Sequence, residues 1–507
     1  MTMTASPRTE PSAGGTPARH VRVAIIGTGF AGLGMAIKLK EAGEHDLVLL
    51  ERATGVGGTW RDNTYPGCQC DVPSHLYSFS FAKNPNWSRS FAEQHEIKAY
   101  LEDCAERFDL LPHCLFGHEV LEARWVDAER RWHITTSQTE LTADLLISGH
   151  GPLSEPAYPV LPGLETFAGT TFHSATWDHD HDLAAERVAV IGTGASAIQF
   201  VPAIQPKVGA LHLFQRTPAW VIPRADRPIS SRTKRLLRRV PALQQLARGS
   251  IYWARELFVI PMAKVPKLMA VPQKAAVKHL AEQIEDPALR AKLTPSFSIG
   301  CKRVLLSNEY YPALNQPNVE VHTDAIAEVR PHAIVTAAGD EVPVDTIIFG
   351  TGFRVTDHPI AQRIVGRGGR RLADRWVGGM EAHLGATVDG FPNFFMIVGP
   401  NTGLGHSSMV VMMEAHFAYI LDAIATMRQR GAATFEVKAE AQAAYNDQIQ
   451  RDLAGTIWSS GCSSWYLGAN GRNSSLWPTF TSTFKKRTAR FDAENYELTT
   501  APATVPA

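Results

Sequence analysis

The sequence contains two copies of a glycine pattern that follows a short apolar run and precedes a helix-like stretch. The first copy places Gly27, Gly29 and Gly32 directly after the apolar residues 21–26. These glycines allow a tight turn, let the backbone approach a pyrophosphate, and let the helix pack closely on the strand. The N-terminus of the helix supplies N–H groups for the phosphates. The pattern therefore predicts a Rossmann-type dinucleotide-binding unit.

An acidic residue follows the first copy at the position that contacts a ribose in such units. Glu51 stands twenty-four residues after Gly27, at the end of a second strand-like run, where its carboxylate can accept hydrogen bonds from ribose hydroxyls. Its negative charge repels a 2′-phosphate, so the first site fits FAD or NAD. Gly58, Thr59 and Trp60 come next, in a glycine-rich stretch that would allow close approach to a flat ring or a second phosphate. The alternative for this stretch is a surface turn with packed aromatic residues.

The second copy consists of Gly192, Gly194 and Ala197, again after a short apolar run. Arg216 follows Gly192 by twenty-four residues, which is the offset that separates Gly27 from Glu51. A base therefore replaces the acid, and a guanidinium can bind a 2′-phosphate through two charge-assisted hydrogen bonds. The second site is expected to select NADPH over NADH. The alternative is that Arg216 is a solvated surface charge.

The length of 507 residues predicts more than one domain. We expect an α/β protein with two Rossmann-like dinucleotide-binding domains, one for FAD and one for NADPH, and a helical insertion in the NADPH domain. The expected boundaries are as follows: a disordered leader at 1–20, an FAD-binding domain at 21–150 and 387–497, an NADPH-binding domain at 151–223 and 297–386, the insertion at 224–296, and a flexible tail at 498–507.

The charge balance and the hydropathy of the chain limit the kinds of partner that it can have. Lysine and arginine total 50, as do aspartate and glutamate, so no overall field favours nucleic acid or a membrane surface. The most apolar helix-like stretch, at residues 407–427, carries Glu414, His416 and Asp422, which favours a buried helix over a membrane span. Residues 1–20 lack the apolar core of a signal peptide. The oligomeric state does not follow from these data.

The six cysteines have neither metal-type spacing nor a Cys-x-x-Cys pair. This distribution is typical of scattered reduced thiols, and it favours a cytoplasmic protein. No metal site is expected from the sequence.

Two further motifs have several fixed positions each. Between the two glycine patterns, Phe167, Gly169, His173, Trp177 and Asp178 fit F-x-G-x-x-x-H-x-x-x-W followed by Pro or Asp. Taken alone, this segment could be an ordinary loop at a strand edge, with Phe167 and Trp177 in a core and His173 hydrogen-bonded nearby. The second motif, [A/G]-G-x-W-x-x-x-x-[F/Y]-P-[G/M]-x-x-x-D, is met by Gly57, Gly58, Trp60, Tyr65, Pro66, Gly67 and Asp71.

On these motifs the chain resembles the Baeyer–Villiger monooxygenases, type I enzymes within the class B flavoprotein monooxygenases, over about residues 21–486. The resemblance implies an NADPH-dependent FAD enzyme of the EC 1.14.13 type. NADPH would reduce FAD, NADP⁺ would stay bound, and O₂ would add to the flavin as a C4a-peroxide that attacks a small-molecule ketone. The product would be an ester or lactone, with sulfoxidation as a side activity.

The resemblance also assigns roles to single residues. Arg303 matches the active-site arginine and Asp71 the acid that orients it. Lys302 would join Arg216 and Thr217 at the NADPH phosphate. Trp465 matches a loop tryptophan that closes over NADP⁺ and substrate. The segment 167–178 would join the two domains and set how they move, with His173 as a coupling residue. Past Asn470 the sequence departs from the cyclic-ketone enzymes, so the class of ketone stays open.

Three other classes of protein are alternatives to this interpretation. A flavin N- or S-oxygenase uses a similar fold, but it usually lacks the terminal Trp-Asp of the first motif. A pyridine nucleotide–disulfide reductase needs a redox dithiol beside its flavin, and Cys68-Gln-Cys70 does not have the usual spacing. A nonenzymatic nucleotide sensor would have no need for an Asp71 and Arg303 pair.

Overall fold

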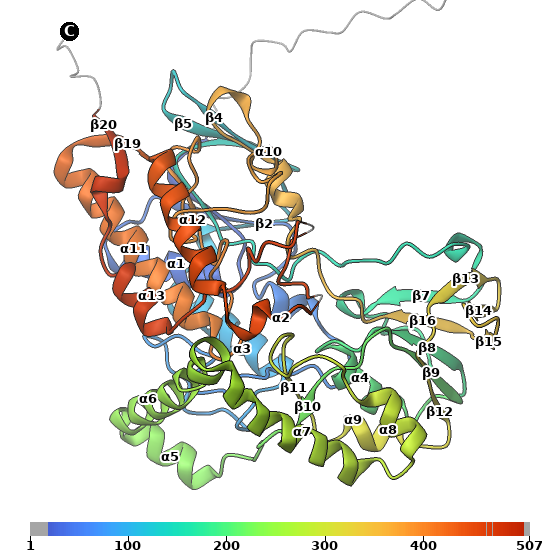
Figure 1. Ribbon diagram of the computed structural model, residues 1–507. Helices are drawn as coiled ribbons and strands as arrows, with labels where there is room; N and C mark the ends of the chain where they lie inside the picture. The colour runs from blue at the N-terminus through green and yellow to red at the C-terminus, as the bar shows by residue number, and fades with distance from the viewer. Residues whose placement is uncertain (1–18, 463, 469, 501–507) are drawn as a thin grey trace, which may run out of the picture.

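A computed structural model describes residues 19–462, 464–468 and 470–500. The chain forms two main sheets with helices around them, so the predicted α/β class with two dinucleotide-binding domains is confirmed. In Figure 1 the first domain lies at the upper left, the second at the right, and a group of helices lies beneath both. Residues 1–18 and 501–507, which include most of the expected leader and tail, lie outside the described residues.

The first domain is built on an eight-stranded sheet with the order β17-β4-β5-β6-β1-β2-β3, in which β18 also pairs with β6. Its central strand β1 is parallel to β2 and β6, and the side chains of Val23, Ala24 and Ile25 are fully buried. A strand covered on both faces needs such a continuous apolar run. The strands of this sheet are β1 (Arg19–Ile26), β2 (Leu47–Glu51), β3 (Cys114–Phe116), β4 (Val120–Val126), β5 (Arg131–Thr136), β6 (Glu140–Ser148), β17 (Ile364–Val365) and β18 (Phe394–Met396).

Helices α1 (Phe30–Glu41), α3 (Gln94–Arg107) and α11 (Met409–Arg430) cover one face of this sheet. Helix α11 is long and apolar enough to cross a membrane by length and composition, but 56% of its most apolar window is buried in the protein core. It packs against α1, where a Cβ on Gly34 would lie 2.5 Å from a ring carbon of Phe417. Helix α11 is therefore a core helix, as the sequence predicts.

The second domain has a five-stranded parallel sheet with the order β12-β9-β8-β16-β7. Two short helices pack on one face, and the antiparallel β13-β14-β15 meander covers the other. The elements are β7 (Thr170–His173), β8 (Arg187–Ile191), α4 (Ala197–Ile204), β9 (Ala210–Phe214), α9 (Tyr310–Leu314), β12 (Val319–His322), β13 (Ile326–Arg330), β14 (Ala333–Thr336), β15 (Glu341–Pro343) and β16 (Thr346–Phe349).

A run of helices interrupts the second domain between β10 (Val221–Ile222) and β11 (Leu305–Leu306), which pair with each other. The helices are α5 (Ser231–Arg239), α6 (Pro241–Glu256), α7 (Ala270–Gln283) and α8 (Pro287–Leu293). Helix α6 is anchored on the first domain, because the buried Arg248 donates hydrogen bonds to the carbonyls of His75, Leu76 and Ser78. At the end of α6, Glu256 accepts a 2.6 Å hydrogen bond from the Thr481 hydroxyl.

Three expected boundaries are wrong. Strand β1 begins at Arg19, so residues 19 and 20 belong to the first sheet and not to a leader. Strand β17 pairs with β4, so the chain has returned to the first sheet by Ile364 and not at residue 387. Strand β20 (Tyr496–Thr500) pairs with β19 (Ala432–Val437), so residues 498–500 belong to a sheet and not to a tail. Both pairings join segments far apart in the chain, and β17 has only two residues, so neither leaves a local pattern. Helices α12 (Ala439–Leu453) and α13 (Thr481–Arg487) complete the C-terminal part of the first domain.

Candidate active site

The first glycine turn connects β1 to α1. Gly27 has a φ of +95°, a conformation that favours glycine, and a Cβ on Gly32 would lie 1.9 Å from the Gly27 carbonyl oxygen. A Cβ on Gly29 would lie 3.6 Å from the Cα of Gly58, which precedes α2 (Thr59–Asp62). The turn and the second motif therefore face each other at the start of α1.

Glu51 ends β2 beside this turn, as the sequence predicts, and it is almost fully buried. Its Oε2 accepts hydrogen bonds from the backbone N–H of Thr28 at 3.0 Å and from the Thr28 hydroxyl at 2.7 Å. The guanidinium of Arg61 lies 3.1 Å from its Oε1. These donors hold the carboxylate in position at the carboxyl end of the strand, where a ribose would bind.

The second glycine turn connects β8 to α4. Gly192 has a φ of +111°, and a Cβ there would lie 2.4 Å from the Gly350 carbonyl oxygen, so the turn packs tightly against the end of β16. The hydroxyl of Thr193 donates to the carbonyl of Thr217 at 3.1 Å. This contact places Thr217 and its neighbour Arg216 beside the turn, past the end of β9.

Arg216 and Lys302 are two cations that lie close together. Burial lowers the pKa of Lys302, and the positive charge of Arg216 lowers it further. The ammonium of Lys302 lies 4.9 Å from the centre of the Phe297 ring. Within the part of the chain that the structure describes, no carboxylate forms an ion pair with either cation. Such a pair of uncompensated cations fits an anionic group such as a phosphate.

Asp71 and Arg303 form a bidentate ion pair. The Nε of Arg303 donates to Oδ2 of Asp71 at 2.8 Å, and its Nη2 donates to Oδ1 at 2.7 Å. The negative charge of Asp71 raises the pKa of Arg303, so the guanidinium keeps its charge at every accessible pH. About a third of the Arg303 side chain stays exposed, at 32%. The pair therefore presents a fixed positive charge to the adjoining cavity.

Two residues near this pair were not predicted from the sequence. Burial raises the pKa of Tyr466 to about 12, and its hydroxyl is close enough to Arg303 and Asp71 for their charges to affect that pKa. Burial lowers the pKa of Arg255, whose charge likewise interacts with Asp71 and Arg303. Arg255 lies seven residues after Arg248 on α6, so the two side chains share one face of the helix, and this spacing could have indicated that both face the first domain. Tyr466 had no signal beyond its position next to Trp465.

One cavity of about 1180 Å³ joins most of these groups. Its lining includes residues from both domains, from the segment before β11, and from the C-terminal loop that carries Trp465. The predicted site residues on the lining are Thr59, Trp60, Asp71, Gly192, Gly194, Arg216, Thr217, Lys302, Arg303 and Trp465. The predicted site residues Gly27, Gly29, Gly32, Glu51, Gly58 and Ala197 are not part of this lining. The first turn and Glu51 lie next to it, at the start of α1 and the carboxyl end of β2.

The segment 167–178 is part of the second domain, and the expectation that it links the two domains is wrong. Its residues Thr170–His173 form β7, the edge strand that pairs in parallel with β16. A Cβ on Gly169 would lie 2.0 Å from the carbonyl oxygen of Asp345, which explains the glycine. Phe167 packs in the core beneath the meander, and the ring of Trp177 lies 5.3 Å from that of Phe200. Asp178 caps the following turn by accepting from the backbone N–H of Asp180 at 3.0 Å.

His173 ends this strand and is fully buried. Burial lowers the pKa of its imidazole to about 4, and its Nδ1 accepts a hydrogen bond from the backbone N–H of Ala175 at 3.0 Å. Its ring packs against Tyr158 and Phe353, with ring centres 5.3 and 6.0 Å away. Residues Tyr158 and Phe353 line the cavity on the two segments that run between the domains. His173 therefore supports these crossing segments from the second domain.

Cys301 and Cys462 form a disulfide with their Cα atoms 6.3 Å apart, so the expectation of reduced thiols is wrong for this pair. The bond ties the segment that carries Lys302 and Arg303 to the loop that carries Trp465. The remaining cysteines, Cys68, Cys70, Cys104 and Cys114, are free and buried. Burial raises the pKa of the Cys68 thiol to about 12, which does not suit a redox dithiol.

Comparisons with known proteins identify the family of the chain. Residues 24–242 match the family described as pyridine nucleotide-disulphide oxidoreductase. The chain is 53% identical over 491 residues to a Baeyer–Villiger monooxygenase of Streptomyces coelicolor, covering 96% of this chain and 95% of the relative. It is also 53% identical over 489 residues to a Baeyer–Villiger monooxygenase of Pseudomonas aeruginosa, covering 96% and 93%.

A solved structure of OTEMO in complex with FAD and NADP superposes with a TM-score of 0.85 at 28% identity, covering 94% of this chain and 99% of that one. Together with the two dinucleotide-binding domains, these relatives place the chain among the flavin monooxygenases. Within that class it belongs to the Baeyer–Villiger monooxygenases, so the resemblance seen in the sequence is confirmed.

The disulfide predicts a thiol count. We expect four reactive thiols in denaturant without reductant, because six cysteines include one disulfide, and six thiols after reduction. Titration with a thiol-specific chromophore after lysis in an alkylation-free buffer measures both values. The Cys462→Ser variant serves as a control and is expected to give five thiols without reductant, namely the four free cysteines and Cys301. Six thiols in the unreduced wild-type protein would contradict the pairing.

Proposed function

We propose that this protein uses NADPH and O₂ to insert one oxygen atom beside the carbonyl of a small-molecule ketone, which gives an ester or lactone. The observation that carries the proposal is the bidentate Asp71–Arg303 pair on the cavity that also contains Arg216 and Lys302. Bound FAD would supply the activated oxygen, and NADPH would supply the reducing equivalents.

The residues of both turns fit these two cofactors. The first turn, Glu51, Thr59 and Trp60 would hold FAD, because Gly29 has no Cβ that would block the approach of a pyrophosphate and Glu51 is placed for a ribose. The second turn, Arg216, Thr217 and Lys302 would hold NADPH. The uncompensated charges of Arg216 and Lys302 suit its 2′-phosphate, which NADH lacks.

Arg303 would stabilise negative charge as it develops on the reacting oxygen atoms. A preorganised cation in a site that excludes water lowers the barrier without reorganisation at the moment of reaction. Asp71 would keep the guanidinium in one orientation, since both of its oxygens accept from Arg303. Trp465, which is 48% exposed at the cavity, would cover the bound nicotinamide and substrate and keep water out.

An N- or S-oxygenase of the same fold is the alternative. The fixed Asp71–Arg303 charge favours the ketone reaction, because it suits an anionic, nucleophilic oxygen rather than an electrophilic one. Sulfoxidation would then be a side activity. We propose a cytoplasmic location. Because the cytoplasm is reducing, the Cys301–Cys462 disulfide would have to persist there under reducing conditions.

A product screen tests the function. Purified protein with FAD, NADPH and ¹⁸O₂ is incubated with linear, cyclic and aryl ketones, and with an amine and a sulfide for comparison. We expect an ester or lactone that carries one ¹⁸O atom from at least one ketone class, measured by mass spectrometry. Oxygenated amine with no product from any ketone would overturn the proposal in favour of the N-oxygenase.

Replacing Arg303 separates reduction from oxygenation. We expect Arg303→Ala to leave anaerobic reduction of FAD by NADPH within a few-fold of the wild-type rate. Ester formation is expected to fall by about 100-fold or more, the usual cost of removing one group that stabilises the transition-state charge. Stopped-flow absorbance and product analysis measure the two steps. Arg239→Ala, at the exposed end of α5, is the matched control, and unchanged ester formation in Arg303→Ala would remove Arg303 from this role.

Replacing Arg216 tests cofactor selection. We expect Arg216→Ala to raise the KM for NADPH by about tenfold or more, because a charge-assisted hydrogen bond to the 2′-phosphate is lost. The KM for NADH is expected to change little, since NADH carries no such phosphate. Steady-state oxidation of each nucleotide measures both values, and an unchanged preference for NADPH would exclude Arg216 from the site.

A further inference from the structure

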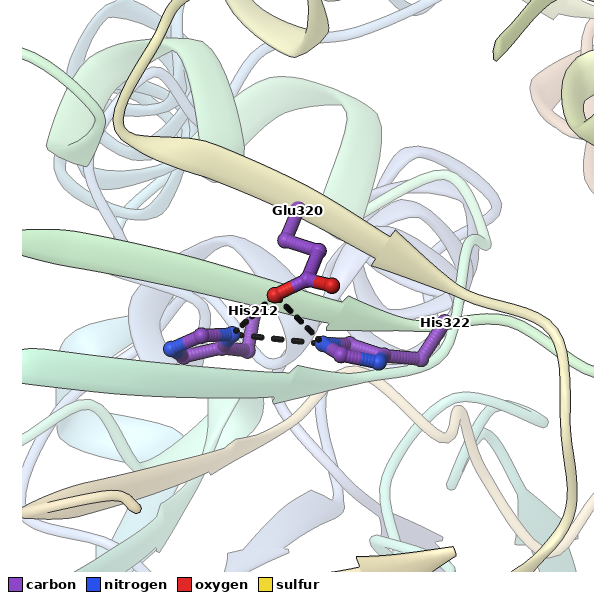
Figure 2. A group of neighbouring side chains, drawn as sticks. All are labelled: His212, Glu320 and His322. Atoms are coloured by element: carbon purple, nitrogen blue, oxygen red, sulfur yellow. Dashed lines mark hydrogen bonds and ion pairs between the residues drawn. The ribbon is translucent and has the colours of Figure 1, made fainter. Parts of the chain in front are cut away.

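A compact group of three side chains lies on the second domain, next to the cavity but not part of its lining. His212 belongs to β9, and Glu320 and His322 belong to the neighbouring edge strand β12. Glu320 is opposite His212 in the parallel register, and His322 is two residues further along β12. Because side chains two residues apart point to the same face of a strand, all three meet on one face, and Figure 2 shows them converging.

The separations of their polar atoms are nearly equal. Nδ1 of His212 lies 3.2 Å from Nε2 of His322, and each of these nitrogens lies 3.5 Å from Oε2 of Glu320. A charge-assisted hydrogen bond to a carboxylate is usually about 2.7–2.9 Å long. The distances to Glu320 are therefore long for direct hydrogen bonds, although the two imidazoles could share one.

The same separations match the ligands of a tetrahedral metal ion. Ligand atoms at about 2.0–2.1 Å from zinc, at tetrahedral angles, are about 3.3–3.4 Å apart. A circle through three atoms separated by 3.2, 3.5 and 3.5 Å has a radius of about 2.0 Å, which is the length of a Zn–N bond. An ion slightly out of the plane of the three atoms would reach all of them without any movement of the backbone.

The surroundings hold the two imidazoles in place and leave access from solvent. The side chains of His212 and His322 are 14% and 11% exposed, while that of Glu320 is 62% exposed. The Phe214 ring stacks on His322 with centres 4.7 Å apart and an interplanar angle of 17°. The two rings are thus oriented before any ion binds, and the exposed carboxylate side allows entry and a water molecule as fourth ligand.

We propose that His212, Glu320 and His322 bind one divalent transition-metal ion of the zinc class. Two imidazoles and one carboxylate favour zinc, cobalt or nickel over calcium or magnesium, which prefer oxygen ligands. The ion links the edge strand β12 to β9. The link is close to the nucleotide site, because the backbone N–H of Gln215 donates to the carbonyl of His322 at 2.9 Å and Arg216 follows directly. The site stabilises the end of β9 from which Arg216 extends.

Metal titration of the FAD-loaded full-length protein, without a histidine tag and after chelator treatment, tests the site. We expect Co²⁺ to bind with one equivalent tighter than about 10 µM and to give the visible absorption of a tetrahedral cobalt centre. Zn²⁺ is expected to displace it and to raise the unfolding temperature. Calorimetry with Zn²⁺ measures the stoichiometry independently of any catalytic activity.

Two variants test the ligands, and a third serves as the control. His322→Asn is expected to lose the cobalt spectrum and one equivalent of metal, and the exposed Glu320→Gln is expected to weaken binding by about tenfold or more without affecting the fold. His332→Asn, an exposed histidine of the same domain, is the matched control and is expected to bind as the wild type does. The proposal is overturned if the wild type binds no Co²⁺ below about 100 µM, or if Glu320→Gln and His322→Asn bind it as tightly as the wild type.

Discussion

The ion pair between Asp71 and Arg303 is the contact on which the candidate active site depends. It joins residues 232 positions apart, with Asp71 from the first domain and Arg303 from the segment that follows the helical insertion. Two hydrogen bonds of 2.7 and 2.8 Å fix the guanidinium in a plane, so its charge has both a position and a direction. The pair therefore holds the first domain to the returning chain of the second at the point where both meet the cavity.

Other features converge on the same segment. The disulfide from Cys301 joins it to the loop of Trp465, and Lys302 extends from it toward Arg216. Helix α6 brings Arg255 close to the ion pair from below. Because α6 is held to the first domain through Arg248 and Glu256, the insertion connects the two domains as well as extending one of them. Contacts from three parts of the chain therefore hold the positively charged side chains at the cavity in place.

Local patterns were sufficient to predict much of this arrangement. The offsets from Gly27 to Glu51 and from Gly192 to Arg216 could be read directly, because strand, turn, helix and next strand are consecutive in a Rossmann unit. The return of the chain to the first sheet at β17 could not be predicted, because a strand of two residues has no periodic pattern of apolar side chains. The disulfide joins cysteines 161 residues apart, and sequence cannot assign such a pairing. The segment 167–178 was predicted as a linker, yet its residues Thr170–His173 form an edge strand whose partner β16 lies more than 170 residues further along the chain, so no local pattern revealed the pairing.

The central claim is that Asp71 and Arg303 act as one unit in oxygenation, and a double-mutant cycle tests it most directly. The rate of ester formation per reduced flavin is measured for the wild type, Asp71→Ala, Arg303→Ala and the double variant. The account predicts that the double variant is no slower than Arg303→Ala, with a coupling energy of about 1 kcal/mol or more, because Asp71 acts only through the guanidinium. Losses that simply multiply would contradict it, since the two residues would then act independently.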